Sequence, residues 1–369
     1  MKAIILAGGP GTRLRPLSCT RPKLLFPILN RPALDWTLEN LSKAGVSEVV
    51  LAVNYMAAAL QAFLGRRKYG LRILYSKEPR ALGTGGPIKL AEKILKLKPG
   101  EPLLILNGDI WSDVDFAALR EAHRRHMEEY DAVMTLTLRE VKDVSRYGVV
   151  EVDGKGRILK FREKPRGGKR KGLINAGIYL TDRKIFRRLE ERRFSLEREL
   201  FPRLAEEGKL YGFKHEGLWS DIGKIEDFMA VNFKVLELRA EGRLEIGRGA
   251  KVAREAQLRP PVWVGEKAKI AAGAVVGPYA VLGNGVHVGE RCKIKKAVVF
   301  DRAEVGARSL IQDSVVGEGA VIGRGVKIRD QTVIGDHAFV ADALKLVRKV
   351  SICPHKEVGI SLIGPRILA

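Results

Sequence analysis

The chain has 369 residues, 46% of them hydrophobic, which predicts about two domains with buried cores. Its 66 basic residues outnumber its 43 acidic ones, and the net charge of +23 suits a nucleic-acid surface, an anionic substrate or a solvated basic exterior. There is no run of about eighteen apolar residues, no leader-like segment, no basic cluster interleaved with aromatic residues and no close pair of cysteines. We therefore expect a cytoplasmic protein without membrane anchor, nucleic-acid partner, disulfide framework or zinc site.

The first predicted element is a buried strand that runs into a glycine-rich loop. Residues 3–7 are small and aliphatic, as in a parallel strand covered on both faces, and Gly8, Gly9 and Gly11 follow. Glycines let the backbone approach an anion closely and donate N–H groups to it, and Arg13 can face phosphate oxygens. The spacing fits neither the dinucleotide-binding fingerprint nor the P-loop. The segment predicts a nucleoside triphosphate site of another type.

Strands and amphipathic helices alternate up to about residue 238. This alternation predicts an α/β fold, a mostly parallel sheet with helices on both faces. Later strands are expected to extend or edge the sheet. The strands are expected at 3–7, 48–53, 71–75, 102–106, 131–139, 148–152, 157–162, 174–180 and 209–214, and the helices at 34–44, 55–64, 86–96, 115–129 and 224–241.

Two carboxylates stand where a metal site is expected. Asp109 follows an aliphatic strand, and the carboxyl end of a parallel strand lies at the ligand crevice of such a sheet. Asp221 lies in the segment Trp219-Ser220-Asp221-Ile222-Gly223. Two carboxylates suit Mg²⁺, which keeps waters and substrate oxygens in its other positions. Each aspartate alone is also compatible with a helix cap.

From Ile246 onward a six-residue repeat replaces the alternation. The repeat resembles the left-handed parallel β-helix, in which three hexads form one coil and the aliphatic residues stack inside. We expect about five coils, one-residue slips at Val305 and Val316, and a tail after Ala343 that caps the end. The predicted domains are therefore 1–238 and 239–369. The expected interior positions are Ile246, Val252, Leu258, Val264, Ile270, Val276, Leu282, Val288, Ile294, Phe300, Val305, Ile311, Val316, Ile322, Ile328, Ile334 and Val340.

The motif G-G-x-G-T-R-L-x-P-L at 8–17, followed by R-P-K-x-L-x-P at 21–27, resembles the signature of the sugar-1-phosphate nucleotidyltransferases. These pyrophosphorylases join a nucleoside triphosphate to a sugar-1-phosphate. The resemblance covers essentially the whole chain, since several branches of the family carry a β-helix after a Rossmann-like nucleotidyltransferase sheet. It implies a Mg²⁺-dependent enzyme and a homo-oligomer formed through the β-helix.

The same resemblance implies a role for individual residues. Arg13 would hold the β- and γ-phosphates, Lys23 the α-phosphate, and Lys164 of the Glu163-Lys164-Pro165 motif the sugar phosphate; with the metal ligands Asp109 and Asp221 these form the expected catalytic set. The implied nucleotide-binding residues are Leu6, Ala7, Gly8, Gly9, Gly11, Thr12, Arg13, Lys23, Glu78, Gly83 and Thr84, and the implied sugar-phosphate residues are Gly148, Glu163, Lys164 and Asn175.

Three segments are most similar to the mannose-1-phosphate guanylyltransferase branch: 82–87, 220–228 and the tail 354–368. Glu78 fits this branch chemically, because one carboxylate can accept from both N1–H and the 2-amino group of guanine. We therefore expect GTP and mannose-1-phosphate as substrates and GDP-mannose as product. The loop from Glu78 is two residues longer than that branch predicts, so UTP or dTTP with glucose- or N-acetylglucosamine-1-phosphate is an alternative.

Three further alternatives concern other classes of protein. The family includes catalytically silent regulatory relatives, although retention of the expected catalytic set argues against one here. The net charge leaves a nucleic-acid-binding protein as an alternative. Salt-dependent retention of the protein on a DNA or RNA column would reveal such binding. Some β-helices are acyltransferases, and His287, His337 and His355 are the candidate bases for that chemistry.

Overall fold

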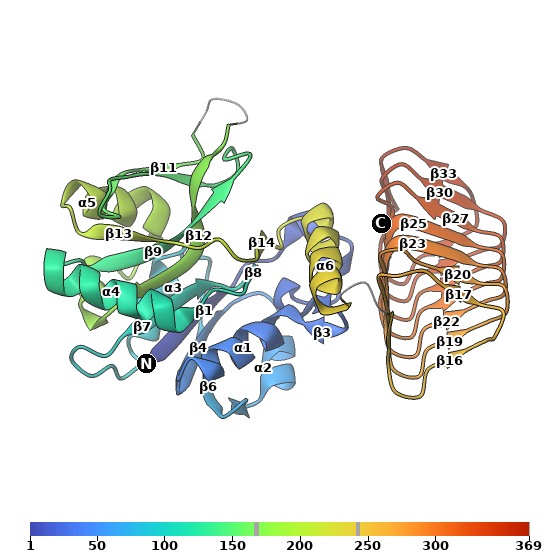
Figure 1. Cartoon of the computed structure of the whole chain (residues 1–369), viewed down its shortest axis with the longest axis horizontal. Helices are drawn as coiled ribbons and strands as arrows, with labels where there is room; N and C mark the ends of the chain where they lie inside the picture. Colours follow the sequence, from blue (N-terminus) through green and yellow to red (C-terminus); the bar gives the residue numbers. More distant parts are fainter. Residues whose placement is uncertain (166–169, 241–243, 369) are drawn as a thin grey trace. The chain divides into compact units, whose positions relative to one another are not determined.

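The structure is a computed structural model that describes residues 1–165, 170–240 and 244–368 (Figure 1). The chain forms two compact units, one comprising Met1–Gly9 and Leu34–Asp221 and the other Pro10–Ala33 and Ile222–Ala369. The glycine-rich loop is thus divided, with Gly11 grouped with the hexad repeat. The domain boundary that the sequence predicts between residues 238 and 239 stays a prediction. No helix in the described ranges is long and apolar enough to cross a membrane.

The first unit is built on one sheet of ten strands (Figure 1). The strands are β1 (Lys2–Ala7), β4 (Glu48–Val53), β5 (Arg67–Lys68), β6 (Leu71–Lys77), β7 (Leu103–Asn107), β9 (Met134–Val141), β10 (Gly148–Val152), β11 (Ile158–Glu163), β12 (Gly172–Thr181) and β13 (Leu210–Lys214). Their order is β11-β10-β12-β7-β1-β4-β6-β5, and β9 pairs with both β12 and β13.

The centre of this sheet is parallel. Strand β1 pairs in parallel with β4 and with β7, and β4 pairs in parallel with β6. Ala3, Ile4 and Ile5 are each 0% exposed although successive side chains point to opposite faces, so both faces are covered. Strand β12 is antiparallel to β7, and β10 is antiparallel to β12. The expected Rossmann-like α/β fold is confirmed, and antiparallel strands extend its parallel centre.

Helices and short turns pack on the sheet. One buried cluster joins Ile4 and Ile105 of the central strands to Ile88 of α3 and to Phe201 and Leu204 of α5. The sequence did not reveal α5 or the turns before it, because the basic segment that precedes them hides their apolar spacing. The helices are α1 (Ala33–Lys43), α2 (Ala57–Leu64), α3 (Gly86–Ala91), α4 (Phe116–Tyr130) and α5 (Phe201–Glu206), and the turns before α5 cover Arg183–Arg188 and Leu196–Leu200.

The second unit contains the helix α6 (Ile225–Ala240) and a series of short parallel strands that continues to Leu368. One of its sheets stacks seven strands: β16 (Lys251–Val252), β19 (Lys269–Ile270), β22 (His287–Val288), β24 (Glu304–Val305), β26 (Val321–Ile322), β29 (Phe339–Val340) and β32 (Glu357–Val358). Residues 251, 269 and 287 are paired at intervals of 18, whereas 287, 304 and 321 are paired at intervals of 17. This ladder confirms a coiled parallel β domain with two one-residue slips.

The structure corrects the place of the first slip. Val299, not Phe300, occupies the interior ladder, in which it pairs with Leu282 on one side and Val316 on the other. Phe300 is buried outside the coil, where its ring contacts Phe26 and Phe228. The sequence misled because both residues of the Val299-Phe300 pair are apolar.

The structure also corrects the tail after Ala343, which was expected to cap the coil. It continues the coil instead, because β30 (Lys345–Val347) and β31 (Val350–Ile352) pair in parallel with strands one turn earlier. β33 (Leu362–Ile363) and β34 (Arg366–Leu368) then stack on these two strands. The hexad spacing holds to Val358 and is lost at Leu362, where the strands still pair, so the strand pairing outlasts the repeat.

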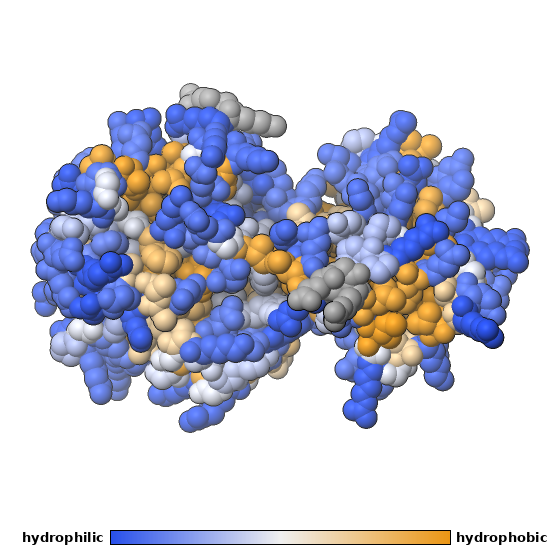
Figure 2. Space-filling model, viewed as in Figure 1, coloured by the Kyte–Doolittle hydropathy of each residue, from blue (hydrophilic) through white to orange (hydrophobic). Residues whose placement is uncertain are grey.

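Hydrophilic side chains cover much of the surface. Figure 2 shows them spread over the visible face of each unit, with apolar side chains gathered in places on both units. Many of the basic residues are paired locally, as Arg124 is with Glu121 and Glu128. Such a pattern is typical of a solvated basic exterior.

Candidate active site

The end of β1 and the loop after β6 meet at Gly8. The Oε1 atom of Glu78 lies 2.6 Å from the position that a Cβ on Gly8 would occupy, so a side chain there would displace that carboxylate. Glu78 is 6% exposed, and its Oε2 accepts a hydrogen bond from the Leu82 N–H (3.1 Å). Burial raises the pKa of Glu78, although the Leu82 N–H partly offsets it. Glu78 therefore braces its own loop, and Oε1 is the oxygen directed at the glycine turn.

The expected nucleotide residues Gly83 and Thr84 lie in the continuation of this loop. Gly83 has φ +78°, and a Cβ there would lie 2.5 Å from the carbonyl oxygen of Phe194. The Thr84 hydroxyl donates to Glu197 Oε2 (2.7 Å) and accepts from the Leu196 N–H (2.9 Å). Segment 194–197, which sequence reasoning missed, thus holds the shape of the loop.

In the second unit, the remaining part of the glycine-rich loop is brought next to Lys23. Gly11 has φ +60°, and its ideal Cβ would lie 3.6 Å from the Cβ atoms of both Lys23 and Ser18. The Ser18 hydroxyl donates to the Gly11 carbonyl (2.8 Å). Arg13 lies in an exposed 3-10 turn, Thr12–Leu14. The signature motif therefore places glycine backbone and a lysine side by side within one compact segment.

The two proposed metal ligands are brought together by strand pairing within the first unit. Asp109 follows β7, and the Gly108 N–H before it donates to the Leu6 carbonyl at the end of β1 (3.0 Å). The strand after it, β8 (Ile110–Ser112), is antiparallel to β14 (Trp219–Asp221), and Asp221 pairs with Ile110. Asp221 thus pairs with Ile110, the residue that directly follows Asp109 in the chain.

Contacts of Arg146 and Trp219 connect Asp221 to the segments that carry the expected sugar-phosphate residues. Arg146 lies 3.5 Å from Asp221 (Nη2 to Oδ2), and the Trp219 indole N–H donates to the Ala176 carbonyl (2.8 Å). The rings of Tyr147 and Trp219 make an edge contact with centroids 5.5 Å apart. Sequence reasoning missed Arg146, and its position next to the Tyr147-Gly148 segment was the available signal.

Glu163 and Lys164 stand opposite Gly148. Strand register pairs Gly148 with Glu163, and the Lys164 N–H donates to the Tyr147 carbonyl (3.1 Å). Lys164 has φ +45°, a left-handed conformation that is uncommon for a lysine and is concentrated at functional sites. Its ammonium lies 3.1 Å from Glu163 Oε1, and its side chain is 60% exposed. The pair thus presents an accessible cation and a carboxylate from one edge of the sheet.

Asn175 opens an irregular stretch of β12. Its pairing with β9 shifts between Asn175 and Tyr179, and Gly177 within this bulge has φ +75°. The amide of Asn175 donates to the Tyr179 hydroxyl (3.0 Å) and accepts from the Gly177 N–H (2.9 Å). Asn175 thus shapes the bulge, whose Ala176 carbonyl receives the Trp219 indole. Bulges commonly re-aim groups beside active sites.

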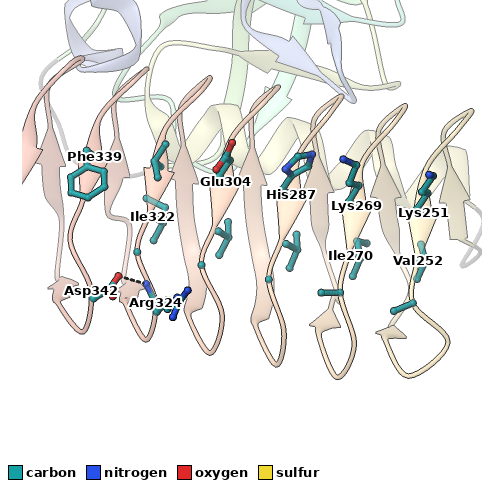
Figure 3. Close-up of a pocket in the computed structure, with 18 residues that line it drawn as sticks. Lys251, Val252, Lys269, Ile270, His287, Glu304, Ile322, Arg324, Phe339 and Asp342 are labelled. Carbon is teal, nitrogen blue, oxygen red and sulfur yellow. Dashed lines mark hydrogen bonds between the residues drawn. The ribbon is translucent and has the colours of Figure 1, made fainter.

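The three histidines considered for acyl transfer lie apart from these residues along the chain. His287 is exposed in a shallow groove of about 740 Å³ on the seven-stranded sheet, between Lys269 and Glu304 in the ladder (Figure 3). His337 and His355 stack on each other with ring centroids 5.1 Å apart. Acyltransferase activity of the β-helix stays an alternative prediction.

Comparison with known proteins gives two family matches, one to each part of the chain. Residues 2–237 match a family model described as Nucleotidyl transferase, and residues 246–368 match one described as GMPPB C-terminal domain. The chain is 35% identical over 375 residues to "Probable mannose-1-phosphate guanylyltransferase 3" of Oryza sativa subsp. japonica, with 100% of both sequences covered. It is 36% identical over 374 residues to "Mannose-1-phosphate guanylyltransferase catalytic subunit beta" of Danio rerio, again with 100% of both covered.

A solved structure shows the same likeness for the first part of the chain. HddC from Yersinia pseudotuberculosis, crystallised in complex with GMP-PN, is 29% identical, with a TM-score of 0.53. The match covers 63% of this chain and 99% of that one.

Proposed function

This chain belongs to the nucleotidyl transferase family, and we propose that it transfers GMP from GTP to mannose-1-phosphate to form GDP-mannose and pyrophosphate. The chain is a nucleotidyltransferase by that membership. The choice of substrates is supported by full-length similarity to proteins named for this reaction and by a related structure that holds GMP-PN. The homo-oligomer and the cytoplasmic location expected from the sequence stay predictions.

One observation supports this chemistry most directly: the register that pairs Asp221 with Ile110 brings Asp221 beside the residue that follows Asp109. In the reaction, a phosphate oxygen of the sugar-1-phosphate attacks the α-phosphorus, and the bond from that phosphorus to the bridging oxygen of pyrophosphate breaks. Both reactants are anions, so catalysis depends on positioning and charge neutralisation. Cationic side chains and a divalent metal are what such a site requires.

The two aspartates fit Mg²⁺. This ion commonly binds through one or two carboxylates and completes its shell with water and phosphate oxygens. Among the described residues no group of three or more acidic, histidine or cysteine side chains forms a fuller cage. When bound, Mg²⁺ would neutralise charge on the phosphate oxygens. Asp109 and Asp221 would hold it, and Arg146, 3.5 Å from Asp221, would help to orient that carboxylate.

Each basic residue of the expected catalytic set is assigned to a different phosphate group of the two substrates. We assign Lys164 to the phosphate of mannose-1-phosphate, because its ammonium is exposed and its backbone is held in an unusual conformation. Glu163, beside it, is placed to accept from sugar hydroxyls. Lys23 is assigned to the α-phosphate and Arg13 to the β- and γ-phosphates, supported by the compact loop in which Gly11 adjoins Lys23. The N–H groups of Gly8, Gly9 and Thr12 would donate to the nucleotide, with Leu6 and Ala7 lining the strand end.

Glu78 is the proposed contact to guanine. Its Oε2 already accepts from the Leu82 N–H, so Oε1 would receive the base. Burial raises the pKa of Glu78, and the hydrogen bond from the Leu82 N–H acts in the opposite direction, in favour of the carboxylate.

The experiment measures pyrophosphate release in the presence of Mg²⁺ for each combination of GTP, UTP, dTTP, ATP and CTP with mannose-, glucose- and N-acetylglucosamine-1-phosphate. We expect the highest kcat/KM with GTP and mannose-1-phosphate. Preference for UTP or dTTP with a glucose phosphate would overturn the substrate assignment but not the enzyme class. No turnover with any pair would favour the catalytically silent alternative.

A further inference from the structure

A buried ion cluster joins the signature segment to the β-helix within the second unit. The Arg21 guanidinium lies 2.6 Å from Glu318 Oε2 and 2.7 Å from Asp336 Oδ2, with the same Nη2 atom directed at both. The Thr20 hydroxyl donates to the same Asp336 oxygen (2.6 Å). The side chain of Asp336 is 3% exposed and that of Arg21 is 19% exposed. The signature motif thus places two consecutive residues on one buried carboxylate about 315 positions away in the chain.

The β-helix side of this cluster is rigidly held. The other carboxylate oxygen of Asp336 accepts from the Glu318 N–H (2.8 Å), a bond between successive coils. Glu318 also pairs with Arg302 of its own region. Burial alone would lower the pKa of Arg21, but the charges and hydrogen bonds of Asp336 and Glu318 raise it. The guanidinium therefore stays charged in a place where losing either carboxylate would leave it poorly compensated.

Aromatic packing extends the contact from Arg21 to the residues after Lys23. The Arg21 guanidinium lies 5.0 Å from the centroid of the Phe300 ring. Phe300 makes edge contacts with Phe26 and with Phe228 of α6, whose rings are also in edge contact with each other, 5.4 Å apart. The outward position of Phe300, which the slip at Val299 creates, is what brings this ring to Arg21 and Phe26.

Lys23 lies between these two anchors. Arg21 precedes it by two residues, with Pro22 at φ −63° between them, and Phe26 follows it by three. The Phe26 N–H donates to the Lys23 carbonyl (3.1 Å), and Leu24 is 1% exposed. A lysine side chain is flexible, so the place its ammonium can reach is decided by where its backbone is held.

We propose that Asp336 and Glu318 are positioning residues for nucleotidyl transfer, which hold Arg21 and thereby fix the backbone of Lys23 where its ammonium serves the α-phosphate. This inference rests on the proposed function through the role given to Lys23. The β-helix is on this view a part of the catalytic apparatus, because it supplies the carboxylates that the signature segment needs to adopt its active conformation.

The test compares Asp336→Asn with the matched variant Asp342→Asn. Asn keeps the oxygen that accepts from the Glu318 N–H but removes the charge that faces Arg21. Asp342 makes the same coil-to-coil bond, accepting from the Arg324 N–H (2.7 Å; Figure 3), and no residue of 10–33 bonds to it in the described structure. Both substitutions leave an oxygen that can accept the coil-to-coil bond, and of the two aspartates only Asp336 faces Arg21, so faster exchange confined to Asp336→Asn reports on Arg21.

The first readout needs no substrate. Amide hydrogen exchange of peptides covering residues 17–29 is expected to be about tenfold faster in Asp336→Asn than in the wild type, and unchanged in Asp342→Asn. The Leu25 and Phe26 amides, hydrogen-bonded to the carbonyls of Pro22 and Lys23, report most directly. Equal exchange in the two variants would overturn the proposal.

The second readout is kinetic. We expect kcat to fall about tenfold or more in Asp336→Asn, with the KM for the sugar phosphate unchanged, because only groups that act through Lys23 are displaced. A combined Arg21→Gln, Asp336→Asn variant should lose no more than the worse single variant, since both remove one interaction. Additive losses, or a kcat within twofold of Asp342→Asn, would overturn the positioning role.

Thr20→Val provides a milder variant if Asp336→Asn folds poorly. It removes the bond to Asp336 (2.6 Å) and a longer bond to the Leu17 carbonyl (3.2 Å), and it changes no residue of the β-helix. We expect the same direction of change in exchange and kcat, with a smaller size. If the wild type turned over no substrate pair, only the proposed function would fail. Unchanged exchange in Thr20→Val and Asp336→Asn would separately overturn the positioning role of Asp336.

Discussion

The sheet of the first unit and the β-helix use aliphatic strands in different ways. In the sheet, β1 pairs with residues about 46 and 101 positions away, and consecutive side chains are buried on both faces. In the described β-helix the paired strands are 16 to 18 positions apart, and buried residues such as Ile270 alternate with exposed ones such as Lys269. The sheet concentrates polar groups where its strands end, whereas the β-helix repeats one stabilising contact along its length.

This contrast suggests a division of labour, in which substitutions at the strand ends alter activity and substitutions inside the coil alter stability. The Arg21 cluster is the proposed exception, because there the β-helix acts on the catalytic segment.

Asp109→Asn should have the largest effect. Removing the carboxylate at the end of β7 weakens charge neutralisation in the transition state, and we expect kcat to fall on the order of 100- to 1,000-fold. The midpoint of thermal unfolding should change little, because Asn keeps the size of the side chain. Steady-state kinetics and a thermal melt on the same preparation check both statements. Activity within a few-fold of the wild type would remove Asp109 from the catalytic set.

Ile294→Ala should show the opposite behaviour. Ile294 is 0% exposed in the interior of the coil, and truncating a buried isoleucine costs about 2–5 kcal/mol through lost burial and the cavity left behind. We expect a lower urea midpoint for the β-helix and kcat near that of the wild type at 25 °C. A large loss of activity without loss of stability would contradict the division between the two regions.

His123 links the stability of the first unit to pH. Burial first, and the charge of His126 second, lower the pKa of His123 from its ordinary 6.5 to about 4, and its Nδ1 lies 2.9 Å from the Thr135 hydroxyl. In the unfolded chain, His123 therefore binds a proton below about pH 6.5. In the folded chain it does so only below about pH 4. The free energy of unfolding should thus be fully retained above pH 6.5 and fall by about 2 kcal/mol between pH 7 and pH 5.

Urea unfolding at the two pH values measures this change. The variant His123→Leu should lose most of the pH dependence, because it removes the titrating group and keeps a buried side chain of similar bulk. An unchanged slope in that variant would assign the dependence to other groups.

Asp115→Ala should have the smallest effect. Asp115 caps α4 by accepting from the N–H groups of Ala117 (2.8 Å) and Ala118 (3.0 Å). Its loss should lower the free energy of unfolding by about 1 kcal/mol and leave kcat unchanged. Because it lies six residues after Asp109, it is a matched control for that variant, and a comparable loss of activity would show that the whole segment is sensitive to substitution.

Much of the fold could be predicted from the amino-acid sequence alone. The aliphatic blocks predicted the central strands to within a few residues, since a strand covered on both faces needs an unbroken apolar run. The hexads predicted the coil and the number of slips, because each coil repeats the same contact at a fixed interval. The glycine-rich motif predicted the turn at Gly8 and Gly11, where the structure brings a carboxylate against the backbone or has a positive φ.

Which residues meet across long separations was decided only by the tertiary structure. The sequence contained Arg21 and Asp336, but nothing in its local pattern related two residues 315 positions apart. The pairing of Asp221 with Ile110 and the burial of Glu78 likewise depend on how strands and loops pack. Phe300 shows the limit most clearly: its apolar side chain suited the interior as well as Val299 did, and only the stacking of neighbouring coils decided which of the two faces inward. Contacts that repeat at a fixed interval can be recognised in the sequence. The partners of a charged side chain depend on how the helices and strands pack in the tertiary structure.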